Sequence, residues 1–207
     1  MNKFEEAIRT CLGDEAFGKV QRAKVGIAGL GGLGSNCAVN LVRAGFRKIK
    51  IADFDSIDHT NLNRQFYFLD QVGLPKTKAL KVNLERINPE LQIEVFQGRI
   101  EKDNILELFA DCDVIVEAFD KAEYKSMLVE MMAPTGKMIV LASGLAGIGN
   151  SDEIKVHKVR ENLVIVGDLL SDVADSFPIS PRVNVAAAKQ ADVVLEYVVG
   201  NGVSSIE

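Results

Sequence analysis

The stretch "GIAGLGGLGSN", residues 26–36, reads as the end of a buried strand followed by a glycine-rich turn. Gly29, Gly31 and Gly34 satisfy the G-x-G-x-x-G pattern of dinucleotide-binding turns, and Gly32 adds a fourth glycine. Such glycines permit a tight bend, the approach of a phosphate to the backbone, and close packing of the next helix on the strand. The free N–H groups at the start of that helix attract an anion. We therefore predict that this turn binds a nucleotide.

Strands and helices alternate along the chain on both sides of this turn. Apolar runs predict strands at 24–29, 48–55, 91–97, 112–120 and 137–143. Apolar residues at helical spacing predict helices at 33–45, 75–88 and 124–133. This alternation indicates a doubly wound α/β fold, in which a mostly parallel, Rossmann-like sheet has helices on both faces. Ligands bind such sheets beyond the carboxyl ends of the strands.

The last third of the chain has a weaker pattern. Residues 144–150 read as a loop, 153–159 and 163–167 as short antiparallel strands, and 181–199 as a closing helix. A chain of 207 residues is long enough for one α/β domain with a sizeable core, and a second full domain would be cramped. We therefore predict one nucleotide-binding domain. It is divided into a helical segment, a Rossmann-like core, and C-terminal strands with a helix, at 1–23, 24–142 and 143–207.

The composition favours a soluble, cytoplasmic protein. Hydrophobic residues make up 47% and charged residues 26% of the chain, which is ordinary for a globular protein. No run is apolar enough to cross a membrane, and the start "MNKFEEAIRT" lacks the apolar stretch of a secretory signal. The net charge of −5 disfavours nucleic acid as the main partner.

The three cysteines do not form a recognisable metal or disulfide pattern. Cys11, Cys37 and Cys112 lie far apart and form no CxxC pair, so we expect neither a disulfide framework nor a structural zinc site. Cys37 belongs to the apolar stripe of the first helix after the turn, and Cys112 opens a strand. Both are therefore predicted to be core residues rather than nucleophiles.

Asp53 closes the second predicted strand about 20 residues beyond the turn, where an acidic residue binds a ribose hydroxyl. That contact suits NAD and ATP equally well. Three further motifs bear on this choice: "DFDSIDHTNLNRQ" at 53–65, "GLPK" at 73–76 and "EAFD" at 117–120. Together they resemble the ThiF/MoeB family, the adenylyltransferases that activate the C-terminus of ubiquitin-like sulfur carriers and are related to ubiquitin-activating enzymes.

The segment "PRVNVAAAKQAD" at 181–192 extends this resemblance nearly to the end of the chain. The short length and "EAFD" look most like the compact ThiF subfamily of thiamine biosynthesis. The resemblance implies catalytic roles for Arg64, Lys76 and Asp120. It also implies that ATP contacts the glycine loop, Asp53, and further polar residues. The implied ATP-binding residues are Gly29, Gly31, Gly32, Gly34, Asp53, Asn61, Arg64, Gln65 and Lys76, and Asp120 holds Mg²⁺.

Several of these residues also have a structural interpretation. Asn61 and Asn63 are typical residues for capping a turn, and Asp120 is a typical N-cap for the helix that follows. Gln65 could pack in the core rather than contact the nucleotide, and Arg64 and Lys76 could be solvated charges. The chemistry itself needs cations: adenylyl transfer builds negative charge on the phosphate oxygens and on the departing pyrophosphate.

The predicted partner is a ubiquitin-like sulfur carrier that ends in Gly-Gly. Its carboxylate, with an ordinary pKa of roughly 3.5, is ionised at neutral pH, so the reaction needs no general base. This agrees with a chain that has two histidines, His59 and His157, and no evident triad. The glycine-containing segments 143–150 and 167–182 are candidates for the surface that accepts the carrier tail.

No cysteine follows Cys112, so we expect adenylation to be the whole reaction, with sulfur delivered by a separate protein. Relatives suggest a homodimer, in which Arg9 or Arg22 is a candidate to reach the partner subunit's phosphates. Three alternatives stay open. The first is a related enzyme that adenylates another carboxylate, such as one on a modified tRNA nucleoside. The others are an NAD-dependent oxidoreductase and a non-catalytic nucleotide-sensing module.

Overall fold

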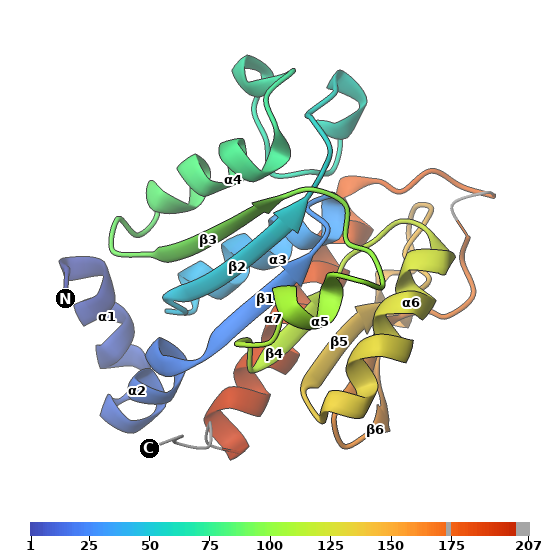
Figure 1. Cartoon of the computed structure of the whole chain (residues 1–207). Coiled ribbons are helices and arrows are strands. Elements are labelled where there is room, and N and C mark those ends of the chain that lie inside the picture. The colour runs from blue at the N-terminus through green and yellow to red at the C-terminus, as the bar shows by residue number, and fades with distance from the viewer. Residues whose placement is uncertain (173–174, 202–207) are drawn as a thin grey trace.

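The computed structural model describes residues 1–172 and 175–201 (Figure 1). Residues 173–174, inside the predicted carrier-facing segment 167–182, lie outside the described residues, as do 202–207 at the end of the predicted segment 143–207. Within the described part of the chain, no helix has the length and apolar character needed to span a membrane.

The described strands form one seven-stranded sheet in the order β3-β2-β1-β4-β5-β7-β6 (Figure 1). All neighbouring pairs are parallel except β6 and β7, which are antiparallel. The carboxyl ends of the parallel strands therefore share one edge of the sheet. The strands are β1 (Lys24–Ala28), β2 (Lys48–Asp53), β3 (Gln92–Gln97), β4 (Val114–Glu117), β5 (Met138–Ala142), β6 (Lys155–Arg160) and β7 (Leu163–Gly167).

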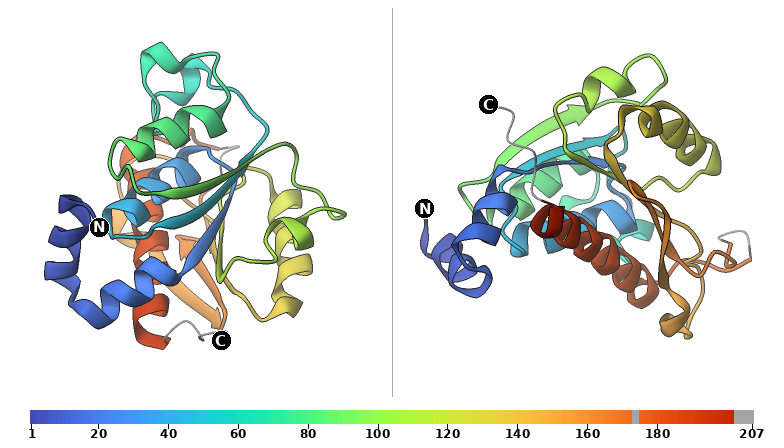
Figure 2. Two further views of the ribbon diagram at one scale, coloured as in Figure 1. Left: turned by 60° about the vertical axis from the view of Figure 1, so that its left-hand side comes forward. Right: turned by 90° about the horizontal axis from the view of Figure 1, so that it is seen from below.

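Helices cover both faces of this sheet, as Figure 2 shows for α3 and α7 on one face and α6 on the other. The helices are α1 (Lys3–Leu12), α2 (Asp14–Arg22), α3 (Gly32–Arg43), α4 (Lys76–Glu85), α5 (Ile105–Leu108), α6 (Ala122–Met132) and α7 (Ser180–Asn201). Single 3-10 turns occur at His59–Asn61, Leu69–Gln71, Ala133–Thr135 and Ser151–Glu153.

The central strands are buried on both faces, which is why their sequences are apolar throughout. In β4, Val114 and Val116 point into the core under α3 and α7, whereas Ile115 points into the core under α5 and α6. The edge strands β3 and β6 are mostly exposed and carry charged residues. Charges on edge strands discourage pairing with other chains.

The structure confirms the predicted doubly wound fold and the antiparallel pair near the C-terminus. It adds that β7 joins the sheet parallel to β5, and it contains a short helix, α5, that the sequence pattern did not predict. The predicted strand 112–120 was too long, because β4 ends at Glu117. The Glu117 carboxylate accepts a hydrogen bond from the Phe119 N–H at 2.6 Å, which turns the chain.

A cluster of charges joins β1, β2 and β3 to the segment before β4. Lys50 Nζ lies 2.7 Å from Asp111 Oδ1 and 3.1 Å from Glu94 Oε2, and Lys24 pairs with the same two acids. Partial burial would raise the pKa of Asp111, but hydrogen bonds from Lys24 and Lys50 outweigh it and lower the pKa to about 2.

We expect this cluster to make stability fall as pH drops from about 4 to about 2. In the folded protein the pKa of Asp111 lies below its ordinary value of 3.8. The ionised carboxylate therefore contributes its full stabilisation at pH values above 3.8, and this stabilisation is lost as the pH falls to about 2. The side chain is 51% exposed, which limits the effect to about 1 kcal/mol. Urea unfolding of Asp111→Asn should show lower stability at pH 7 and a smaller loss between pH 4 and 2. Identical pH dependence in both proteins would contradict the assignment.

Candidate active site

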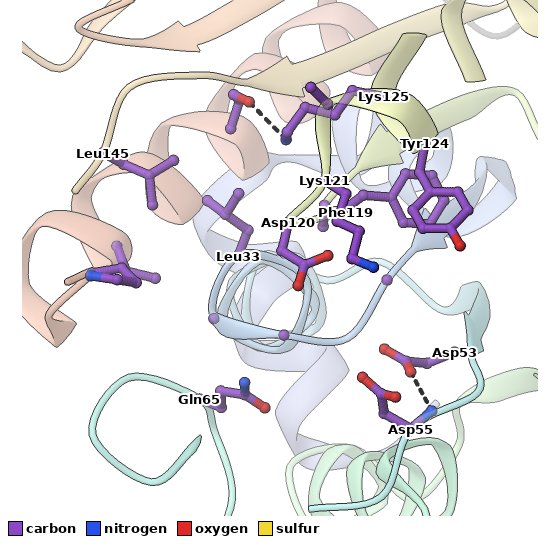
Figure 3. A pocket seen from close by; sticks show the side chains of 18 of the residues that line it. Leu33, Asp53, Asp55, Gln65, Phe119, Asp120, Lys121, Tyr124, Lys125 and Leu145 are labelled. Carbon is purple, nitrogen blue, oxygen red and sulfur yellow. Dashed lines mark hydrogen bonds between the residues drawn. The ribbon is translucent and has the colours of Figure 1, made fainter. Parts of the chain in front are cut away.

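The carboxyl ends of β1, β2, β4 and β5 border a cavity of about 930 Å³ (Figure 3). This volume is typical of small-molecule sites. Most of the predicted site residues line it, and two predicted residues, Gly34 and Asn61, do not. The predicted residues in the lining are Gly29, Gly31, Gly32, Asp53, Arg64, Gln65, Lys76 and Asp120.

The glycines of the loop have different physical roles. Gly29 has a φ of +93°, and a Cβ there would lie 2.8 Å from the Ala118 carbonyl oxygen. A Cβ on Gly34 would lie 1.9 Å from the Gly29 carbonyl oxygen, so this glycine lets α3 pack on the loop. A Cβ on Gly31 would approach only the Gln65 side chain, at 3.9 Å. The cavity is therefore open in front of Gly31, where a phosphate can approach the backbone.

Asp53, the last residue of β2, and Lys76, the first residue of α4, are both buried. The Asp53 carboxylate accepts hydrogen bonds from Leu30 N at 2.6 Å and from Asp55 N at 2.7 Å, which ties the glycine loop to β2. Burial raises the pKa of Asp53, and the charge of Lys76 and these hydrogen bonds oppose the rise. Lys76 Nζ lies 3.0 Å from Asp55 Oδ2. Asp55 is a site residue that the sequence analysis missed.

Arg64 is half-buried and is held by residues that precede it closely in the sequence. Its guanidinium donates to Asn63 Oδ1 at 2.7 Å and to the Thr60 carbonyl at 3.2 Å. Burial lowers the pKa of Arg64, and the negative charge of Asp120 opposes this shift. Asn61 Oδ1 instead accepts from Asp58 N at 3.1 Å, the capping arrangement that we considered. A contact between Asn61 and a ligand stays a prediction.

Asp120 is exposed and points toward the glycine loop in Figure 3. It follows the end of β4 by three residues, and α6 has Lys121 at its N-cap, so Asp120 is not the cap of that helix. Mg²⁺ commonly uses one or two protein carboxylates together with phosphate oxygens. The described residues contain no group of three or more acidic, histidine or cysteine side chains that could hold a metal. One carboxylate, that of Asp120, together with phosphate oxygens of a nucleotide would be enough to bind Mg²⁺.

An ion pair between the buried Glu117 and the half-buried Lys125 lies at the end of β4 and was also missed. Lys125 Nζ lies 3.0 Å from both oxygens of Glu117 and donates to the Ala142 carbonyl at 3.0 Å. Burial raises the pKa of the Glu117 carboxyl, against the charge of Lys125. The pair connects the ends of β4 and β5 to α6. The sequence offered one indication of this pair, because a lysine lies eight residues after the acid of "EAFD".

Aromatic and basic side chains complete the lining. Arg99 lies over the Phe54 ring at 4.7 Å from its centroid, and the Phe119 and Tyr124 rings are 5.7 Å apart. Gln65 is buried, and its Oε1 atom has no hydrogen-bond partner in the structure. This oxygen is therefore available to accept a hydrogen bond from a ligand in the cavity.

The cysteines and the N-terminal arginines lie outside this lining. Cys37 and Cys112 are buried, and burial raises the pKa of both thiols, that of Cys112 to about 12. Buried thiols with raised pKa are poor nucleophiles. Arg9 pairs with Asp14 on the surface, and contact of Arg9 or Arg22 with a partner subunit stays a prediction.

The fold and this cavity define an α/β protein with a glycine turn and basic side chains at the carboxyl edge of its sheet. Residues 5–163 match the ThiF family, and the chain belongs to that family. It is 33% identical over 163 residues to SUMO-activating enzyme subunit 2 of Dictyostelium discoideum, covering 77% of this chain and 24% of that protein. It is 32% identical over 111 residues to molybdopterin-synthase adenylyltransferase of Haemophilus influenzae, covering 53% and 46%. The chain thus spans between 24% and 46% of the length of these two relatives.

Solved structures share the fold over nearly the whole chain. E. coli tRNA N6-threonylcarbamoyladenosine dehydratase in complex with ATP superimposes with a TM-score of 0.82 at 20% sequence identity. The superposition covers 96% of this chain and 93% of that chain. At this identity the likeness establishes the architecture, and the function has to be argued from the site.

Proposed function

We propose that this protein is an ATP-dependent adenylyltransferase that activates the C-terminal carboxylate of a ubiquitin-like sulfur carrier protein. The observation that carries the proposal is that Arg64, Lys76 and Asp120 come from three separate segments and line one cavity with the glycine loop. A cavity with two cations, an acid suited to Mg²⁺ and an anion-binding turn matches the charge changes of adenylyl transfer. The family relatives include a molybdopterin-synthase adenylyltransferase.

In the proposed reaction a carboxylate oxygen of the carrier attacks the α-phosphorus of ATP. The bond from that phosphorus to the bridging oxygen breaks, and its electron pair leaves with pyrophosphate. Arg64 and Lys76 stabilise the charge that develops on the phosphate oxygens, and Asp53 binds the ribose. Asp120 would hold Mg²⁺, which would supply further neutralisation of that charge. The attacking carboxylate is already ionised, so no side chain has to remove a proton.

The carrier tail would enter along the loops that follow β5 and β7. Leu145 lies on the side of the glycine loop away from Asp53 in Figure 3, and Leu145 and Ser171 both line the cavity. Ile148, Leu170 and Phe177, from these loops and the segment before α7, are 84% to 90% exposed. Large exposed apolar side chains near a cavity suit contact with a protein partner.

We further propose that the reaction belongs to thiamine biosynthesis in the cytoplasm, with a ThiS-like carrier; the resemblance of the sequence to the short ThiF proteins supports this. The same resemblance supports a homodimer, in which one nucleotide-binding domain of each subunit carries a site. A separate protein would deliver sulfur to the carrier adenylate, because both buried cysteines are unsuited to attack and the third, Cys11, lies outside the cavity lining.

ATP–pyrophosphate exchange with Mg²⁺ tests this proposal. We expect exchange with an intact carrier ending in Gly-Gly, and none with the same carrier lacking those two residues. Arg64→Ala should lower the exchange rate by about 10²-fold, because a cation at the phosphates is lost. Exchange that depends on a modified tRNA, or NADH binding without any effect of ATP, would contradict the proposal. ATP binding without exchange for any carrier would instead favour a nucleotide-sensing module.

A further inference from the structure

An almost fully buried arginine joins three segments beside the cavity. Arg182, in the first turn of α7, is 4% exposed. Its Nη2 atom donates to Asp168 Oδ2, immediately after β7, and its Nη1 atom donates to the carbonyls of Gly149 at 2.6 Å and Asn150 at 2.9 Å. One guanidinium therefore connects the loop after β5, the loop after β7 and the start of α7.

The Asp168 carboxylate extends these connections. Its Oδ1 atom accepts hydrogen bonds from Leu170 N and Ser171 N, both at 2.8 Å. Partial burial would raise the pKa of Asp168, but these hydrogen bonds and the charge of Arg182 lower it. A Cβ on Gly144 would lie 2.0 Å from Asp168 Oδ1, so the two loops meet without intervening side chains.

The backbone around the pair is held in unusual conformations. Asn150 and Leu169 have positive φ angles of 49° and 62°, which are uncommon for residues other than glycine. A cation in the first turn of a helix also interacts unfavourably with the helix dipole. Unfavourable backbone conformations of this kind persist only where surrounding contacts hold them in place, and here the Arg182–Asp168 pair supplies these contacts.

The loops held by this pair form one side of the cavity. Gly144, Leu145 and Ser171 line it, and α7 contributes Val183, whose Cγ1 would lie 2.8 Å from a Cβ on Gly32. Figure 3 places Leu145 on the side of the glycine loop away from Asp53, the proposed ribose ligand. The pair therefore shapes the wall of the cavity opposite Asp53. With the ribose at Asp53, as proposed above, a second substrate would approach the α-phosphate from this wall.

We propose that Arg182 and Asp168 are positioning residues that shape the wall receiving the acceptor carboxylate and its extended tail. This inference rests on the proposed adenylyltransferase function. The pair does not touch the reacting atoms. It keeps the two loops at the separation that admits the tail, so its loss affects binding of the acceptor and leaves the nucleotide contacts at Asp53, Arg64 and Lys76 in place.

Asp168→Asn tests the proposal with little change in shape. The side-chain oxygen of the asparagine can still accept hydrogen bonds from Leu170 N and Ser171 N. Its NH₂ group, which replaces the second carboxylate oxygen, cannot accept the hydrogen bond from Arg182. We expect the KM for the intact carrier in ATP–pyrophosphate exchange to rise about tenfold or more, because small displacements of a positioned substrate cost large rate factors. The Kd for ATP, measured by calorimetry, should change less than about twofold.

Arg182→Lys is the second variant. Lysine keeps the positive charge, but its N–H groups are all on one nitrogen and cannot reach Asp168 and both carbonyls as the guanidinium does. We therefore expect a KM for the carrier between those of the wild type and Asp168→Asn. Lys158→Ala is the control, because it removes an ion pair with Glu196 whose side chains are 69% and 68% exposed. Its KM for the carrier should equal that of the wild type.

The outcomes separate the two claims. If the wild type shows no exchange with any carrier, the proposed function fails and this inference fails with it. If the wild type exchanges but both variants keep its carrier KM, only the inference is overturned. Equal losses of ATP and carrier binding, or failure of both variants to fold, would also overturn it, because the pair would then serve stability alone.

Discussion

Replacing Asp120 with alanine is expected to lower carrier-dependent ATP–pyrophosphate exchange by about 10²–10³-fold, the loss typical of removing one group that stabilises developing charge. Asp120 lines the cavity, points toward the glycine loop, and interacts electrostatically with Arg64. Because its side chain is exposed, the thermal unfolding midpoint should stay near that of the wild type. Exchange rates and thermal unfolding should be measured on the same preparations.

Two comparisons make this result specific. Asp103→Ala removes another exposed carboxylate, one that lies outside the cavity lining, and should leave exchange unchanged. A titration with Mg²⁺ should show that Asp120→Ala requires a higher concentration for its residual activity. Full activity of Asp120→Ala with an unchanged Mg²⁺ requirement would remove this residue from the proposed metal site.

The second large effect is expected at Gly34. In Gly34→Ala the new Cβ would lie 1.9 Å from the Gly29 carbonyl oxygen and 3.2 Å from the Ala118 Cβ. Both the helix and the loop backbone would have to move, so we expect a loss of about 3 kcal/mol in the free energy of unfolding, together with loss of ATP binding. Urea unfolding and calorimetric titration with ATP measure the two effects.

Gly31→Ala is the matched variant for Gly34→Ala. Gly31 has an ordinary φ of −72°, and its new Cβ would approach only the Gln65 side chain, at 3.9 Å. The protein should therefore lose at most about 1 kcal/mol, the usual range for a change at an N-cap. ATP affinity should nevertheless fall at least about tenfold, because the methyl group occupies the space through which a phosphate approaches the backbone. Unchanged ATP affinity in Gly31→Ala would show that the nucleotide does not use this loop.

The sequence predicted which residues line the cavity better than it predicted the contacts that these residues make. The motifs located Asp53, Arg64, Lys76 and Asp120, which do line one cavity. The sequence did not distinguish the two asparagines of "NLNRQ": Asn63 holds the Arg64 guanidinium, whereas Asn61 caps a turn. Both asparagines are typical turn residues, so their types alone could not assign these contacts.

The partners of buried charges were also beyond the sequence pattern. Lys76 pairs with Asp55, 21 residues earlier, and Lys125 pairs with Glu117. Arg182 pairs with Asp168, 14 residues earlier, although each residue is ordinary in its local sequence. A buried ion pair requires close and well-oriented partners, and that geometry is set by how strands and helices pack.

By itself the sequence determined the alternation of strands and helices, the glycine turn between β1 and α3, and therefore the edge of the sheet that carries the candidate site. These features are local: apolar periodicity and backbone freedom act over a few residues. Only the tertiary structure decided that β7 lies beside β5, that Gln65 is buried without a partner for its oxygen, and which acid faces each buried cation. Those outcomes depend on contacts between distant segments, which form only when the whole chain packs.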